Sequence, residues 1–287
     1  MKKYLASLLR RIPGIEIQNI QESVELALLY GTHRNRNLHP SIIHFSFNKA
    51  ATQYVKSILV AAATENEMVH AGINEYAFNR DFPFLDHLSA VEMKKYSHMF
   101  KNKGYLYSVF GGMIEGIPDL ENYKIVFGVR DPRDILVSSY FSQAFSHPIP
   151  DQNGNKYDEF MKRRKHAIES GIDRYVLAES TKIRDIFDRY ENLLLNRYSN
   201  IYITKYETMT VSFDSWLDDL LCYCDLNVSN RLRNKFTENN KKLKPADEDI
   251  NKHVRKAQPG DYEDKLQPDT IQQLNFTFKH ILRRFGY

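Results

Sequence analysis

The chain has 287 residues, and 42% of them are hydrophobic, which is enough to bury the core of one large α/β domain. Lys and Arg number 40 against 36 for Asp and Glu, so the formal net charge is only +4. A field that weak gives no indication of a nucleic-acid partner. No apolar run approaches the roughly 20 residues needed to cross a bilayer, and Met1–Arg11 lacks the apolar segment of a secretory signal. We therefore expect a cytoplasmic protein without a membrane span.

Two cysteines, Cys222 and Cys224, are separated by a single residue. A disulfide at that spacing would be strained, and one close pair cannot supply the four ligands of a structural zinc site. We expect two reduced thiols and no metal site.

Short apolar runs predict strands, and apolar residues at helical spacing predict helices between them. The predicted strands are Ser41–Phe47, Gly104–Phe110, Lys124–Val129 and Asn200–Thr204. The predicted helices are Ala50–Ala63, Ser89–Phe100, one from Asp131, Asp158–Ser170, Ile172–Leu195, Phe213–Cys224, Val228–Phe236 and a last one from about Pro268 to Phe285. This alternation predicts an α/β fold, a single domain with a central parallel sheet flanked by helices. In such folds the ligand site lies beyond the carboxyl ends of the strands.

The first strand–loop–helix unit, Phe45–Tyr54, has the features of an anion site. Ala50 and Ala51 are small enough for a ligand to approach the backbone, and the start of a helix offers free N–H groups. Lys49 adds a charge and Thr52 a hydroxyl group. The alternative is a solvated lysine on an ordinary turn, because no glycine-rich Walker sequence is present.

A second strand runs into a helix at Val129–Tyr140. Asp131 can cap this helix, and Pro132 suits its first position. Arg130 stands at the carboxyl end of the strand, where a guanidinium can grip a phosphate through two hydrogen bonds. Ser138, two turns along the helix, can reach the same anion. The alternative is an Arg–Asp network at the start of a helix.

These stretches resemble sulfotransferases that use 3′-phosphoadenosine 5′-phosphosulfate (PAPS). That family has a loop of the type Pro-Lys-Ser/Ala-Gly-Thr-Thr, then Arg-(Asp/Asn)-Pro-(Arg/Lys)-Asp-x-x-x-Ser-x-Tyr, and near the end Arg-Lys-Gly-x-x-Gly-Asp-Trp. The corresponding stretches here are Asn48–Gln53, Arg130–Tyr140 and Arg255–Tyr262. The resemblance runs from about residue 40 to the end and is weakest between about 65 and 120. It departs from the family at four positions, Asn48, Ala51, Gln53 and Ala257.

The resemblance implies the P-loop nucleotide-hydrolase-like sulfotransferase fold over residues 1–287. It implies a helical extension over 1–38 and a mobile loop over 239–266 that closes on the nucleotide. It also implies that PAPS is bound and that its product is 3′-phosphoadenosine 5′-phosphate (PAP). The residues implied for the 5′-phosphosulfate are Lys49, Ala50, Ala51, Thr52 and Gln53. Those implied for the 3′-phosphate are Arg130, Ser138, Arg255 and Lys256, and Tyr54 and Tyr206 are candidates for the adenine.

Sulfuryl transfer requires attacking and leaving oxygens in line and charge stabilisation on the moving group. We expect Lys49 to neutralise the leaving phosphate oxygen without a metal ion. For the general base, an imidazole that titrates near the working pH favours His70. Glu75 and Ser108 remain alternatives, and His44 is expected to be packed in the core.

The acceptor is expected to be a small molecule that carries a hydroxyl or an amine. The aromatic segment Tyr76–Leu85 could line its pocket or simply pack over the edge of the sheet. Two other functions stay open: a nucleotide-binding family member without transferase activity, and a P-loop kinase. The kinase would need a magnesium-binding hydroxyl directly after Lys49, where Ala50 stands. The sequence does not indicate an oligomeric state.

Overall fold

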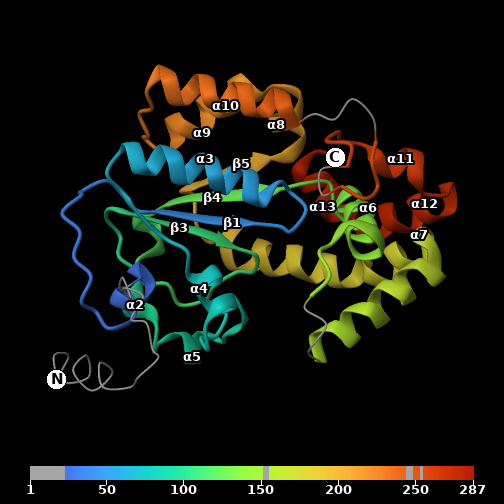
Figure 1. The fold of residues 1–287 in the computed structure, drawn as a ribbon, viewed down its shortest axis with the longest axis horizontal. Coiled ribbons are helices and arrows are strands. Elements are labelled where there is room, and N and C mark those ends of the chain that lie inside the picture. The colour runs from blue at the N-terminus through green and yellow to red at the C-terminus, as the bar shows by residue number, and fades with distance from the viewer. Residues whose placement is uncertain (1–22, 151–154, 244–247, 253–254) are drawn as a thin grey trace, which may run out of the picture.

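The structure, a computed structural model, describes residues 23–150, 155–243, 248–252 and 255–287. Its centre is a five-stranded parallel sheet with the order β2-β3-β1-β4-β5 (Figure 1). The strands are β1 Ile42–Ser46, β2 Val69–Ala71, β3 Tyr105–Phe110, β4 Lys124–Val129 and β5 Ile201–Lys205. The predicted fold class, a single parallel sheet between helices, is confirmed. The sequence did not predict β2, because three residues are too few to show a periodicity.

Alternate residues of the central strands face opposite sides of the sheet and fill two separate cores. Ile42 and Val126 pack with α3 Thr52–Glu65 and α9 Phe213–Tyr223 on one face. Phe45 and Phe127 pack on the other face, where α7 Asn155–Tyr190 crosses beneath the sheet (Figure 1). The helices on both faces explain why the central strands are buried on nearly every residue rather than on every second one.

The long helix α7 corresponds to two predicted helices, Asp158–Ser170 and Ile172–Leu195. Gly171 interrupts its helical geometry with φ 71° and ψ 167°. A positive φ costs glycine little because it has no Cβ, so the break falls at the residue that best tolerates it. The prediction of two segments around this glycine is confirmed.

The remaining helices are mostly short. They are α2 Val24–Leu29, α4 Ile73–Asn79, α5 Ala90–Met93, α6 Pro132–Phe141, α8 Tyr206–Val211, α10 Asn230–Leu243, α11 Asp261–Lys265, α12 Pro268–Thr277 and α13 Lys279–Phe285. Ser89 opens α5 with the predicted capping box, in which Ser89 N donates to Glu92 Oε2 at 2.9 Å. The predicted extent to Phe100 was wrong, since α5 ends at Met93 and a 3₁₀ turn, Ser97–Met99, follows.

Two predicted boundaries also change. The predicted extension over 1–38 includes residues 1–22, which lie outside the described residues, and α2 is its described helix. The predicted loop over 239–266 overlaps two helices, since α10 continues to Leu243 and α11 occupies Asp261–Lys265. Residues 244–247 and 253–254 of it lie outside the description. Cys222 and Cys224 are both free thiols, as predicted. No helix in the described ranges is long and apolar enough to cross a membrane.

Three strand-to-helix connections lie at the carboxyl edge of the sheet. The loop after β1 leads into α3, Arg130 follows β4 and leads into α6, and β5 passes directly into α8. The C-terminal helices α11, α12 and α13 lie at this same end of the molecule (Figure 1). The predicted phosphate-binding segments therefore meet at one edge, as expected for a parallel α/β sheet.

Candidate anion-binding site at the carboxyl edge of the sheet

The loop between β1 and α3 has an unusual backbone. Lys49 and Ala51 have positive φ values of 73° and 55°, while Ala50 between them does not. Ala50 N donates to the carbonyl oxygen of Phe47 at 3.2 Å, so the loop turns tightly before the helix. Ala51 is also the N-cap of α3, so the unpaired N–H groups of the first helical turn open at the same place. This geometry is consistent with the predicted anion site at the start of α3.

Thr52 supports this loop from within. Its Oγ1 donates to the carbonyl oxygen of Phe47 at 2.8 Å and lies 3.1 Å from Ser46 Oγ. The hydroxyl hydrogen is therefore committed to the loop, and a ligand would meet the backbone N–H or a lone pair of Thr52. Ala50 is buried and Gln53 is exposed beside it.

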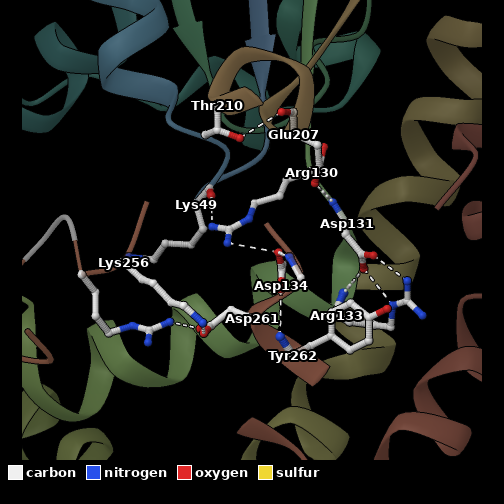
Figure 2. Close-up of polar contacts among 12 residues, drawn as sticks. Lys49, Arg130, Asp131, Arg133, Asp134, Glu207, Thr210, Lys256, Asp261 and Tyr262 are labelled. Atoms are coloured by element: carbon white, nitrogen blue, oxygen red, sulfur yellow. Dashed lines mark hydrogen bonds and ion pairs between the residues drawn. The ribbon is translucent and has the colours of Figure 1, made fainter. Parts of the chain in front are cut away.

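Arg130 lies directly against the loop. Its Nη1 donates to the carbonyl oxygen of Lys49 at 3.0 Å, and its guanidinium lies 4.1 Å from the centre of the Tyr206 ring. Burial, followed by the charge of Arg130, lowers the pKa of Lys49. The two cations implied for opposite ends of one nucleotide are thus neighbours (Figure 2). They are close enough for a single ligand to contact both.

Arg130 also pairs with a fully buried carboxylate. Its Nη2 lies 3.3 Å from Asp134 Oδ2, one turn along α6. Asp134 accepts two backbone hydrogen bonds, from Gly260 N at 2.8 Å and from Tyr262 N at 3.0 Å. Burial raises the pKa of Asp134, and the charge of Arg130 and these two N–H groups oppose that effect. Asp134 therefore joins the segment around Gly260 to α6, next to Arg130.

A second Arg–Asp pair stabilises the start of α6. Asp131 Oδ1 accepts a hydrogen bond from Arg133 N at 2.9 Å, which confirms Asp131 as the cap, and Arg133 Nη2 donates to Asp131 Oδ2 at 2.6 Å. Arg133 also stacks on the Tyr262 ring at 4.0 Å, and Glu207 accepts from Asp131 N at 2.9 Å. The alternative interpretation of this segment, an Arg–Asp network, is therefore present beside Arg130 rather than in its place (Figure 2).

The C-terminal cations converge on another buried acid, Asp261, which is only 1% exposed. Arg255 forms ion pairs with Asp261 and Glu248. Lys256 Nζ lies 3.2 Å from Asp261 Oδ1 and 2.8 Å from Asp264 Oδ2. Lys256 and Asp261 lie at the edge of the site (Figure 2). Arg255 and Lys256 are both paired with carboxylates, and an incoming phosphate would have to compete for them.

The other implied nucleotide contacts differ in their surroundings. Ser138 is half-buried on α6. Tyr206 stacks on Arg130, as noted above, which leaves it beside the site. Tyr54 instead packs on the α9 side, with its OH 3.5 Å from the carbonyl oxygen of Phe236 and its ring 6.1 Å from that of Phe213. Packing is the better interpretation of Tyr54, and Tyr206 is the better candidate for the adenine.

His70, the first choice for the general base, lies level with the amino-terminal end of β1. On β2 it pairs with Leu106, which pairs with Ile42, four residues before the end of β1. That separation is roughly 13 Å along the strand direction. Its Nε2 lies 3.1 Å from the carbonyl oxygen of Ser108. The structure does not bring His70 to the Lys49 loop.

The other candidate bases are engaged elsewhere. Glu75 is exposed and forms an ion pair with Lys56. Ser108 Oγ lies 3.0 Å from Nδ1 of His44, and both residues are at most 1% exposed. Burial lowers the pKa of His44 to about 3, which confirms its place in the core. None of these three groups has a contact with Lys49 in the described part of the chain.

Two buried carboxylates at the site, Asp134 and Asp261, were not assigned roles from the sequence. Each follows an implied phosphate-binding arginine by a few residues, and that proximity was the available signal. The arrangement as a whole defines a protein that binds an anionic ligand at the carboxyl edge of a parallel sheet.

Comparison with known proteins identifies the family. The sulfotransferase domain model matches residues 39–286, and the chain belongs to the sulfotransferase domain family. Among solved structures, it is similar to mouse sulfotransferase SULT7A1 complexed with PAP, with a TM-score of 0.54, 14% identity, and 92% of this chain and 90% of that chain covered. It is also similar to retinol dehydratase in complex with androsterone and inactive cofactor PAP, with a TM-score of 0.50, 13% identity, and 85% and 81% of the two chains covered. At these identities the likeness establishes the fold. Among curated proteins, no sequence matches this chain.

Proposed function

We propose that this family member transfers the sulfuryl group of PAPS to a hydroxyl or an amine of a small-molecule acceptor. The observation that carries the proposal is the contact between the Lys49 loop and Arg130, which places a buried guanidinium, a half-buried lysine and the first N–H groups of α3 at one point. A ligand with anionic groups at both ends of one nucleoside matches this arrangement.

The residues present fit such a ligand. Arg130 Nε is buried and has no partner among the described residues, so within those residues the guanidinium retains an unsatisfied donor. An unsatisfied buried donor is costly unless a ligand pairs with it. Ser138, Arg255 and Lys256 would complete the 3′-phosphate contacts, and Tyr206 would contact the adenine.

On the reacting side, negative charge develops on the oxygen that links sulfur to the 5′-phosphate. Lys49 and the N–H groups of the first turn of α3 would stabilise this oxygen, since fixed cations and dipoles stabilise developing charge most effectively. The sulfuryl group carries less charge than a phosphoryl group, so we expect these groups to suffice without magnesium.

The named ligands of similar structures support the choice of donor and acceptor. The mouse sulfotransferase structure contains PAP, and the retinol dehydratase structure contains PAP and androsterone. In this chain the rings of Phe82 and Tyr76 are 5.6 Å apart, and those of Phe82 and Tyr96 are 5.3 Å apart. This part of the aromatic segment therefore packs on itself, and the acceptor's identity rests on experiment.

The test combines binding and turnover. Calorimetry should show PAP binding at least about tenfold more tightly than adenosine 5′-monophosphate, which lacks the 3′-phosphate that Arg130 would grip. PAP release from PAPS should persist in excess EDTA. Tight PAP binding without release in the presence of any hydroxyl or amine acceptor would favour the inactive binder. Magnesium-dependent ATP turnover would favour the kinase.

A further inference from the structure

A buried carboxylate at the carboxyl end of β3 has one oxygen without a partner. Asp86, in the 3₁₀ turn Leu85–His87, is only 7% exposed. Its Oδ2 accepts hydrogen bonds from Gly112 N at 2.9 Å and from Asn74 Nδ2 at 3.2 Å. Its Oδ1 has no partner in the described ranges. Burying a charged oxygen unpaired costs several kcal/mol, and such a group calls for a functional explanation.

Two further unpaired polar atoms accompany Asp86. Asn74 Oδ1 and Tyr190 OH are also buried without a partner among the described residues. Burial, followed by the negative charge of Asp86, raises the pKa of Tyr190 well above its usual value. Tyr190 therefore remains a neutral phenol near Asp86. Donors and acceptors left open beside each other suit a small polar group that is absent from the protein itself.

The position of this group relative to the Lys49 loop is informative. A Cβ placed on Gly111 would lie 3.9 Å from Asp86 Oδ2 and also 3.9 Å from the side-chain amide of Asn48. Asn48 directly precedes Lys49. Asp86 and the phosphate loop thus approach the same point, the space left open by a glycine at the end of β3.

The strand order then separates donor and acceptor. Asp86 lies at the end of β3, Lys49 follows β1, and Arg130 follows β4, and these strands are neighbours in the order β3-β1-β4. A nucleotide held between Lys49 and Arg130 would lie over β1 and β4. Its sulfuryl group would then face β3. In-line transfer requires the acceptor to approach sulfur from the side opposite the leaving oxygen, which is the side of β3.

We propose that Asp86 is the general base that accepts the proton of the acceptor hydroxyl or amine through Oδ1; this inference rests on the proposed function. The acceptor oxygen or nitrogen forms a bond to sulfur with its lone pair. The bond between sulfur and the bridging oxygen breaks, and its electron pair goes to the 5′-phosphate of PAP. The acceptor proton passes to Asp86 Oδ1.

The first test is the variant Asp86→Asn, which keeps the shape and an oxygen for the Gly112 N–H but removes the basic oxygen. Asp81→Asn, an exposed acid of the same segment, is the matched control. PAP release from PAPS is measured with 2-naphthol, with tyramine and with water alone. We expect Asp86→Asn to lose about 100-fold or more of turnover with an unchanged dissociation constant for PAP and a melting temperature no lower than that of the wild type, since the buried charge is removed. Turnover equal to that of Asp81→Asn overturns the proposal.

If Asp86→Asn fails to fold, the second variant is Asp86→Glu, which retains the carboxylate. We expect Asp86→Glu to keep a measurable part of the turnover. Complete loss of turnover in a folded Asp86→Glu variant that binds PAP overturns the proposal. A wild type that binds PAP but releases none from PAPS contradicts the proposed function instead. In that case a crystal structure with PAP tests the position of Asp86 independently of turnover. Asp86 Oδ1 should open into the cavity that holds the 5′-phosphate, and a carboxylate walled off from that cavity overturns the inference.

Discussion

The guanidinium of Arg130 and the carboxylate of Asp134 form a buried ion pair, with Nη2 and Oδ2 3.3 Å apart, one turn apart along the chain. The two side chains have different second partners. Arg130 donates to the Lys49 loop, whereas Asp134 accepts from Gly260 and Tyr262. The pair therefore couples the segment that contributes Lys49 to the segment that contributes Arg255 and Lys256.

This coupling predicts an asymmetry between single and double variants. Arg130→Met should lower the free energy of unfolding by about 3–5 kcal/mol, because Asp134 is left buried and uncompensated. The double variant Arg130→Met, Asp134→Asn should recover part of that loss, since the buried charge is gone. Urea unfolding measures both. A double variant less stable than Arg130→Met alone would contradict the pairing.

The same variants separate stability from binding. Both should lose PAP affinity to a similar degree, because the guanidinium is absent from each, and calorimetry on the folded proteins checks this. Recovery of PAP affinity in the double variant would show that Arg130 acts only on the fold.

Lys49→Met should reduce PAP release from PAPS by about 100-fold or more, the loss typical of removing a group that stabilises developing charge. Lys49 is half-buried next to Arg130, so removing its charge should not unfold the protein. Lys103→Met, at an exposed lysine, is the control and should behave as wild type. Undiminished turnover of Lys49→Met would remove its assigned role.

Ala51→Gly should stabilise the protein by about 1 kcal/mol, because a non-glycine residue at a positive φ carries a steric penalty of that order. Ala51 has φ 55° and Ala50 does not have a positive φ. Ala50→Gly, one residue earlier and buried, should therefore destabilise instead. Thermal unfolding of the two variants compares them directly. Equal effects of both substitutions would argue against strain at Ala51.

His44 predicts a loss of stability in acid. Its folded-state pKa is about 3, against 6.5 for an unperturbed histidine, so between these values the unfolded chain binds a proton that the folded chain does not. Stability should fall by about 1.4 kcal/mol for each pH unit over most of that window. The raised pKa values of Asp134 and Glu207 act in the opposite sense, since their contribution is lost as pH rises, and they partly offset the fall.

His44→Asn, which can keep a hydrogen bond to Ser108, should flatten this dependence in urea unfolding measured from pH 7 to pH 4. His87→Asn, at an exposed histidine, should retain the wild-type slope. If both variants show the same dependence of unfolding free energy on pH, a group other than His44 causes the loss of stability in acid.

The fold was largely accessible from the sequence because local patterns encode it. The strand Lys124–Val129, the cap at Asp131 and the break at Gly171 each depend on residues close together in the chain, and each was found in the structure. The elements missed, such as β2 and α8, are three and six residues long. Elements so short are formed mainly by tertiary contacts.

The meeting of Lys49 and Arg130 could also be predicted from the sequence, since each occurs where a strand meets a helix. The buried carboxylate Asp86 could not. His70 was favoured because it is an imidazole, and Ser108 was kept as an alternative; the register of the strands places both residues within the sheet. Asp86 was not predicted as a site residue, because no motif surrounds it in the sequence.

The sequence by itself determined that strands would alternate with helices, and hence that Lys49 and Arg130 would emerge at one edge of a parallel sheet. Only the tertiary structure decided which buried acids neutralise the site cations, and which carboxylate stands beside the phosphate loop with a free oxygen. The physical reason is that strand order and close packing bring together residues from distant parts of the chain, and local sequence patterns carry no record of those distances.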